Sequence, residues 1–163
     1  MPRQTVHPVA AVAAAVSLII PLTGCAIHGL SFIQDDRLTI VHPHENAEIS
    51  LPMTLEWTTR DYEGYYAVFF DRAPMRPGQS LRSLVPEDDP CRAQPACPTA
   101  QWLADRHIYV TDRPSLQVDV LPNRRENRRS KNRHEVVIVL LDASGRRIGE
   151  SAFTHEFIVD RDH

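Results

Sequence analysis

Apolar residues recur at every second position in several segments between residues 38 and 160. In the stretch PMTLEWT, for example, Met53, Leu55 and Trp57 alternate with polar residues. Successive side chains of a β-strand point to opposite faces, so this period predicts half-buried strands. The strands are expected at residues 38–41, 52–58, 65–71, 107–111, 116–120, 135–142 and 150–160. Seven short strands and no long amphipathic helix predict an all-β, seven-stranded β-sandwich.

Two of these strands, at residues 65–71 and 135–142, are apolar on both faces. If they are neighbours in one sheet, one face of each belongs to the core and the other forms an apolar outer face. That outer face is expected to comprise Tyr65, Ala67, Phe69, Val137, Val139 and Leu141. An apolar face of this width is not left bare on a monomer. Either the following segment folds back over it, or a partner chain docks on it; we prefer the first interpretation.

The segment at residues 72–106 is a proline-rich insert between two strands. Its Leu81, Leu84, Val85, Trp102 and Leu103 are the side chains expected to cover the outer face. Cys91 and Cys97 are predicted to form a disulfide, the usual state of such a pair in an exported protein. A zinc site is the alternative, but it would need two further ligands at regular spacing. Residues 98–105 are expected to form one short helix beginning at Pro98 and Thr99.

The run NRRENRRSKNR at residues 123–133 carries six basic side chains and a single acidic one. It lies between two predicted strands and is therefore an exposed loop. Either it contacts anionic material such as lipid headgroups or cell-wall polymer, or it is a solvated hairpin loop. It has no interleaved aromatic residues for base stacking, so no nucleic-acid partner is expected. The candidate contact residues are Arg124, Arg125, Arg128, Arg129, Lys131 and Arg133.

Histidines and acidic residues suggest no catalytic or metal centre. His42, His44 and Glu45 are close in sequence, but Pro43 bends the chain there and no third ligand position can be assigned. His155 shares a strand face with phenylalanines and is expected to be a core or edge residue. No nucleophile–base–acid spacing and no phosphate loop occurs. We therefore expect no enzymatic activity, no cofactor and no metal.

The N-terminal stretch has the pattern of a secretory signal: one arginine, an apolar run at residues 9–20 and a small-residue exit. The apolar run is too short to span a membrane, which takes about 20 residues. The exit, Leu22-Thr23-Gly24-Cys25, resembles the lipobox of bacterial lipoproteins. The resemblance implies cleavage before Cys25 and attachment of a diacylglycerol to its thiol. It then implies a signal peptide at residues 1–24, a tether at 25–37, the domain at 38–160 and a tail at 161–163.

The cysteine count agrees with this interpretation. The chain has three cysteines, and an odd cysteine in an exported protein needs an explanation. Lipidation of Cys25 leaves Cys91 and Cys97 as a pair. Removal of the leader takes away Arg3 and changes the formal net charge from −3 to −4, so the whole domain is not expected to bind polyanions.

The strands HEVVIVLLDASG and PMTLEW resemble the sixth and second strands of fibronectin type III and related immunoglobulin-like domains. The matching positions are His134, Val136, Ile138, Leu140, Asp142 and Gly145 in the first and Trp57 in the second, with Tyr66 and Val68 fitting the third strand. The chain departs from the family in its insert and in having His134 at the position of the corner tyrosine. The usual corner hydrogen bond is therefore not implied.

Together these features predict a lipoprotein of the bacterial cell envelope that acts as a binding or assembly module. It would lie on the outer face of the cytoplasmic membrane or at the outer membrane, with a membrane anchor and a protein partner. One alternative is a small-ligand or metal-binding envelope protein that uses the insert as a lid. Another is an accessory subunit of a secretion or surface machine that binds through the apolar sheet face.

Overall fold

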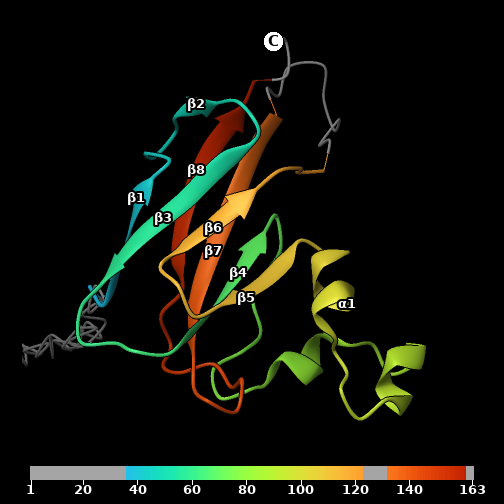
Figure 1. Ribbon diagram of the computed structural model, residues 1–163. Helices are drawn as coiled ribbons and strands as arrows, with labels where there is room; N and C mark the ends of the chain where they lie inside the picture. Colours follow the sequence, from blue (N-terminus) through green and yellow to red (C-terminus); the bar gives the residue numbers. More distant parts are fainter. Residues whose placement is uncertain (1–35, 123–131, 161–163) are drawn as a thin grey trace, which may run out of the picture. The chain divides into compact units, whose positions relative to one another are not determined.

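The protein is a mostly-β domain of two packed sheets, seen in a computed structural model that describes residues 36–122 and 132–160 (Figure 1). The predicted leader, Cys25, the tether up to residue 35, the loop at 123–131 and the tail at 161–163 lie outside the described residues. One sheet has the strand order β1-β3-β6 and the other β2-β8-β7-β4-β5. The strands are β1 (Leu38–His42), β2 (Glu48–Ile49), β3 (Met53–Thr59), β4 (Tyr65–Phe70), β5 (Ile108–Thr111), β6 (Ser115–Val118), β7 (Asn132–Leu141) and β8 (Phe153–Val159).

Each of the seven predicted strands is present, but the count of seven was wrong. The described residues contain eight strands, and the additional one is β2, which is two residues long and pairs in parallel with the end of β8. A strand of two residues is too short to show a period in the sequence. The chain therefore changes sheets between β1, which pairs with β3, and β2, which pairs with β8.

Strands β4 and β7 are antiparallel neighbours, the arrangement on which the predicted apolar outer face depended. Val68 is paired with Ile138, so both side chains point into the space between the sheets. Leu55, Trp57 and Phe157 meet them there, each at most 2 % exposed. The pairing register therefore fixes which face of each strand belongs to the core.

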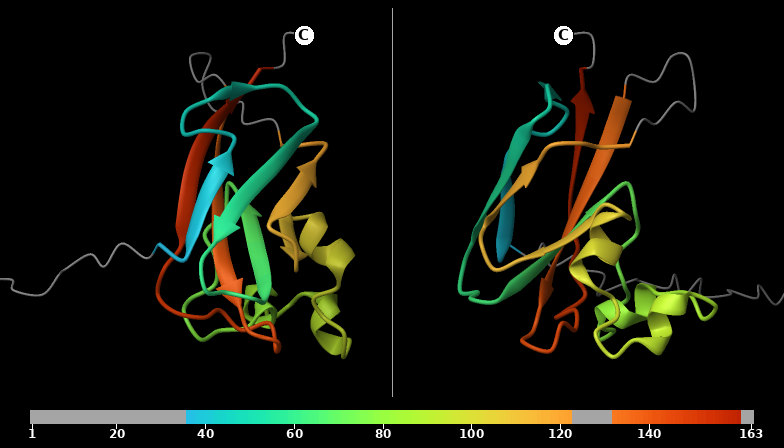
Figure 2. Two further views of the ribbon diagram at one scale, coloured as in Figure 1. Left: turned by 60° about the vertical axis from the view of Figure 1, so that its left-hand side comes forward. Right: turned by 45° about the vertical axis from the view of Figure 1, so that its right-hand side comes forward.

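The outer face of the three-stranded sheet is polar. Thr39 on β1 lies opposite Thr58 on β3, and Thr54 Oγ1 lies 3.0 Å from Gln117 Oε1 on β6. The insert covers the other outer face, that of the five-stranded sheet (Figure 2). The three-stranded sheet thus has one apolar face on the core and one polar face in solvent, which is common for antiparallel sheets.

The insert contains three short helical elements: η1 (Leu81–Leu84), η2 (Pro90–Ala93) and α1 (Ala100–Ala104). The predicted helix at 98–105 is thus confirmed as α1. Thr99 is its N-cap, with its hydroxyl oxygen accepting the Trp102 N–H at 3.1 Å. Among the described residues, no helix has the length and apolar character needed to cross a membrane.

Candidate interaction surface

The outer face of the five-stranded sheet is buried beneath the insert. Phe69, Val139 and Leu141 are at most 1 % exposed. They form one apolar cluster with insert residues that include Val85, Trp102 and Leu103, and Leu81 and Leu84 pack against its margin. The structure therefore has the first of the two predicted arrangements, in which the insert covers the face.

The proposed partner surface on this face needs correction. Five of the six residues of this face, Ala67, Phe69, Val137, Val139 and Leu141, are at most 4 % exposed, whereas Tyr65 is 46 % exposed. The apolar character that suggested a docking site is satisfied within the chain. A partner that binds this domain in the described arrangement must therefore use another surface.

A disulfide joins Cys91 and Cys97, as the sequence predicted, with 5.5 Å between their Cα atoms. Both cysteines are buried members of the covered cluster. The residues between them, 92–96, are all exposed. The disulfide therefore closes a small exposed loop whose two ends are fixed in the interior.

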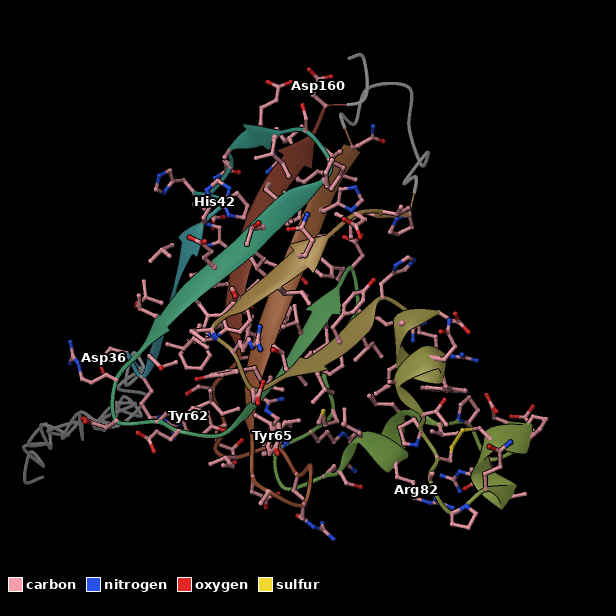
Figure 3. The ribbon with its side chains drawn as sticks, viewed as in Figure 1. Asp36, His42, Tyr62, Tyr65, Arg82 and Asp160 are labelled. Atoms are coloured by element: carbon pink, nitrogen blue, oxygen red, sulfur yellow. A yellow bond between two sulfur atoms is a disulfide. The ribbon has the colours of Figure 1, made fainter. Side chains whose placement is uncertain are left out.

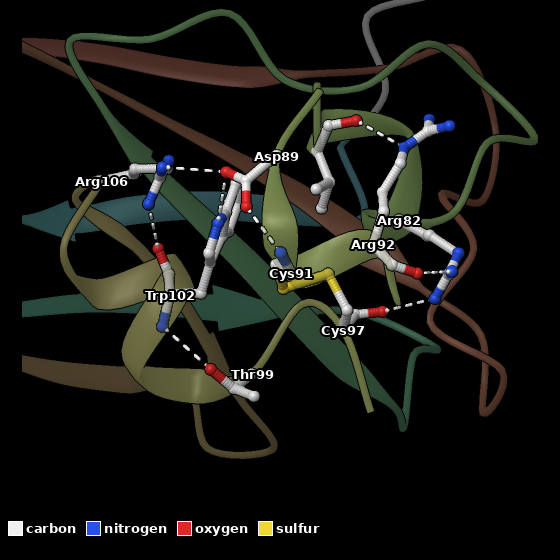
Figure 4. The surroundings of a disulfide bond; sticks show 9 residues. Arg82, Asp89, Cys91, Arg92, Cys97, Thr99, Trp102 and Arg106 are labelled. Atoms are coloured by element: carbon white, nitrogen blue, oxygen red, sulfur yellow. Dashed lines mark hydrogen bonds and ion pairs between the residues drawn. A yellow bond between two sulfur atoms is a disulfide. The ribbon is translucent and has the colours of Figure 1, made fainter. Parts of the chain in front are cut away.

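The Asp89 carboxylate links the disulfide loop to α1 (Figure 4). Oδ1 accepts the Cys91 N–H at 2.8 Å, and Oδ2 accepts the Trp102 Nε1–H at 3.0 Å. Arg106 Nη2 lies 3.3 Å from Oδ2, and its guanidinium carbon lies 3.8 Å from the centre of the Trp102 ring. The hydrogen bonds from Cys91 and then Trp102 lower the pKa of this carboxyl, because they favour its charged form.

Two arginines of the insert are directed to backbone carbonyls. Arg82 donates from Nη2 to Arg92 O at 2.7 Å and from Nη1 to Cys97 O at 3.2 Å (Figure 4). Arg92 donates from Nε to Val85 O at 3.1 Å. These bonds hold the disulfide loop against η1, so the loop is fixed on both sides.

A buried arginine, Arg147, fastens the insert to the turn before β8. Nη1 donates to Met75 O at 2.7 Å, and Nη2 donates to Glu150 O at 2.6 Å and Ser151 O at 3.1 Å. Burial lowers the pKa of this guanidinium, although Glu150 acts in the opposite direction. Sequence reasoning missed Arg147, because nothing in the run ASGRRIG distinguishes it from the exposed Arg146.

Tyr62, in the loop between β3 and β4, is a second residue that sequence reasoning missed. The Tyr62 hydroxyl accepts the Leu141 N–H at 3.1 Å and donates to the Leu141 carbonyl. The carbonyl oxygen of Tyr65 lies 2.9 Å from the same hydroxyl oxygen (Figure 3). Burial raises the pKa of Tyr62. An open polar depression lined by Thr59, Asp61, Tyr62 and Glu63 lies beside it.

Two of the described histidines contact acidic side chains. His134 Nδ1 contacts Asp71, and His155 Nδ1 lies 3.1 Å from Glu45 Oε2. His42 and His44 are exposed. Within residues 36–122 and 132–160, no group of three or more His, Cys, Asp or Glu side chains could hold a metal ion.

Of the predicted anion-contact residues, only Arg133 is described. Its Nη1 lies 2.7 Å from Asn46 Oδ1 and 2.8 Å from Glu156 Oε2. Arg124, Arg125, Arg128, Arg129 and Lys131 lie outside the described residues, as does Cys25. Comparisons with protein-family models, curated proteins and solved structures each found no match.

Proposed function

We propose that this protein is a lipid-anchored binding or assembly module of the bacterial cell envelope. The observation that carries the proposal is the Cys91–Cys97 disulfide. Disulfides form and persist in oxidising compartments and are rare in the cytosol. The pairing also uses two of the three cysteines in the sequence, so the chain offers Cys25 no cysteine partner.

The sequence around Cys25 supports lipidation of its thiol. A thiolate is the nucleophile needed to form a thioether, and Cys25 follows an apolar run and three small or apolar residues of lipobox type. One acyl chain gives marginal membrane binding, whereas two or more anchor a protein stably. The mature domain would be tethered to the membrane surface through residues 25–37.

A binding role is favoured over catalysis because several polar side chains of the domain are engaged in contacts that hold the fold together. Asp89 and Arg147 are bound to backbone groups or to neighbouring side chains, and His134 is fully buried. The strand order of the two sheets also supports the resemblance to fibronectin type III and immunoglobulin-like domains. That fold hosts many functions, so it supports a module without identifying its ligand.

The test is an intact mass of the full-length protein expressed in a bacterial host, together with its partition between membrane and soluble fractions. We expect cleavage before Cys25, a mass increase for acyl chains, and recovery in carbonate-washed membranes. Cys25→Ser should lose all three. The double variant Cys91→Ser/Cys97→Ser is the control, since it removes the other two cysteines but should keep the anchor. Membrane recovery of the Cys25→Ser protein would contradict the proposal.

A further inference from the structure

Strand β6 lies at the edge of the three-stranded sheet and has one unpaired side (Figure 1). On its other side it pairs with β3, and the bond from Trp57 N–H to Pro114 O, at 3.1 Å, extends this pairing back to Pro114. The backbone groups of successive strand residues point to alternate sides of the strand. Those of Ser115 and Gln117 therefore point away from β3, where no other strand of the described chain lies. Such an edge is a ready template for pairing with another strand.

Side chains of opposite charge flank this edge. Arg113 lies two residues before β6, Asp119 directly follows it, and both are exposed. Within the described residues the Arg113 guanidinium has no hydrogen bond or ion pair, although the backbone of Arg113 is bound to the Thr111 hydroxyl. Asp119 Oδ1 makes a long contact with Gln117 Nε2, at 3.4 Å. The two charges are thus exposed at opposite ends of one strand edge and are available to an outside partner.

The edge is complementary to a second copy of itself. If two copies of β6 pair in antiparallel with Leu116 opposite Leu116, then Ser115 faces Gln117 and Arg113 faces Asp119. By symmetry each of these unlike pairs occurs twice, as in any isologous two-fold interface. Ser115 and Gln117 are the residues whose backbone groups point outward, so this register lets them exchange hydrogen bonds. A shift of one or two residues in either direction would place Arg113 opposite an uncharged residue.

Leu116 lies at the centre of this pairing. It is half-buried at the margin of the core between the sheets. In an antiparallel pair, facing residues that do not exchange hydrogen bonds have Cα atoms about 4.5 Å apart, so the two leucine side chains would cover each other. Opposite charges that face each other across two strands stabilise the pairing, and like charges weaken it. An apolar centre flanked by two ion pairs therefore favours this register.

We propose that the free edge of β6 pairs with the same edge of a second copy of this chain, with Arg113 of each copy facing Asp119 of the other. This pairing joins the two three-stranded sheets into one continuous sheet. The edge of the five-stranded sheet at β5 differs, because Arg106, which precedes β5, is already bound to Asp89 and lies over the Trp102 ring. The inference goes beyond the proposed function, and it does not depend on the membrane anchor.

The first experiment measures the mass of the full-length protein, expressed in a bacterial host and held in detergent, by sedimentation over a range of concentrations. The parent protein should form a dimer. Arg113→Asp and Asp119→Arg should each raise the dimer dissociation constant at least about tenfold, because each places like charges opposite each other twice. An equimolar mixture of the two variants should associate again, because opposite charges then face each other. Arg76→Asp and Glu87→Arg reverse charges at other exposed positions and should leave the dissociation constant unchanged.

The second experiment tests the register in cells that express the full-length protein. Leu116→Cys should give a disulfide between two copies, because the facing Cα atoms lie within the range that a disulfide can bridge. Gln117→Cys is the matched control: this position is more exposed, but its counterpart lies diagonally, about 7–8 Å away, which is too far for a disulfide. Non-reducing gels and mass spectrometry of the linked peptide identify the bond. The parent protein, with its three native cysteines, should give no linked product.

A parent protein that is monomeric at every concentration, a mixture that associates no better than either charge variant alone, or equal crosslinking at positions 116 and 117 would overturn the inference. Thermal unfolding of each variant shows whether a lost dimer reflects loss of folding. Because Leu116→Cys alters the margin of the core, the mixture of the two charge variants, whose changes lie at the surface, provides an independent test. Membrane recovery, measured in parallel with Cys25→Ser, tests the proposed function, so the two can fail separately.

Discussion

His134 Nδ1 lies 2.7 Å from Asp71 Oδ2, and these side chains are 0 % and 7 % exposed. The other carboxylate oxygen of Asp71 accepts the Glu135 N–H at 2.9 Å. Asp71 has a φ of 56°, a left-handed conformation that aspartate and asparagine tolerate better than most residues. The pair therefore joins the end of β4, where the insert begins, to the beginning of β7.

Asp71→Asn should destabilise the domain by about 1–3 kcal/mol, the cost of leaving a buried donor without an acceptor. Asparagine keeps one acceptor for Glu135 N–H and presents a donor to His134. If His134 then carries its proton on Nε2, that N–H has no acceptor within the described residues, where Nε2 is buried and unpartnered. Chemical denaturation measures the change. Asp112→Asn, at an exposed position, is the control and should have little effect.

Phe69→Ala should lower the free energy of unfolding by roughly 3–5 kcal/mol, the usual cost of deleting a buried phenylalanine side chain. The residue is 0 % exposed beneath the insert. Tyr65→Ala, on the same strand and the same face, is the matched control, because Tyr65 is 46 % exposed. Equal and small effects of the two substitutions would mean that the insert does not cover this face in solution.

Cys91→Ser/Cys97→Ser should destabilise the domain by about 2 kcal/mol, as expected for opening a small loop. In the unreduced parent protein, neither cysteine should react with a thiol reagent under denaturing conditions. Mass spectrometry after labelling gives this result directly. Quantitative labelling of both residues without reductant would contradict the disulfide.

Asp89→Asn should destabilise the insert in a pH-dependent way. Its lowered pKa means that the folded state favours the carboxylate, so this stabilisation is full well above the ordinary value of 3.8 and is lost as pH falls through the folded pKa. The difference in unfolding free energy between the parent protein and the variant should therefore be constant near neutral pH and vanish in acid. Asp142, whose pKa is also lowered, is present in both proteins and cancels. A difference that grows toward low pH would contradict the assignment.

The strands were largely predictable because each has a recognisable apolar pattern in the sequence. The doubly apolar patterns of β4 and β7 showed that both faces of each strand are buried, and the alternation around Trp57 indicated the inward face of β3; the resemblance to immunoglobulin-like domains made β4 and β7 neighbours. The same patterns required a cover for the outer face, and the insert was the one long segment close in sequence that had apolar residues to supply it. The disulfide was predicted from the spacing of the two cysteines together with the secretory pattern of the N-terminal stretch.

The polar contacts that hold the insert were not predictable in this way. Asp89 stands in an acidic run beside Glu87 and Asp88, and nothing local shows that it alone would meet Trp102. Arg147 likewise looks like its neighbour Arg146. These roles depend on contacts between residues distant in sequence, and they arise only once the sheets are assembled. The sequence did not imply the usual corner hydrogen bond at His134; this side chain contacts Asp71, and the Tyr62 hydroxyl binds the backbone of Leu141.

The change of sheet between β1 and β2 has a mechanical consequence. A pull that reaches the domain through residue 36 enters at Leu38 and runs along β1, whose bonds to β3 lie across that direction and are loaded together in shear. If β1 gave way, the load would pass to β2, which is paired separately with β8 in the other sheet. Tension applied at residue 36 would therefore have to separate β1 from β3 and then β2 from β8 before it reached β3 through the chain.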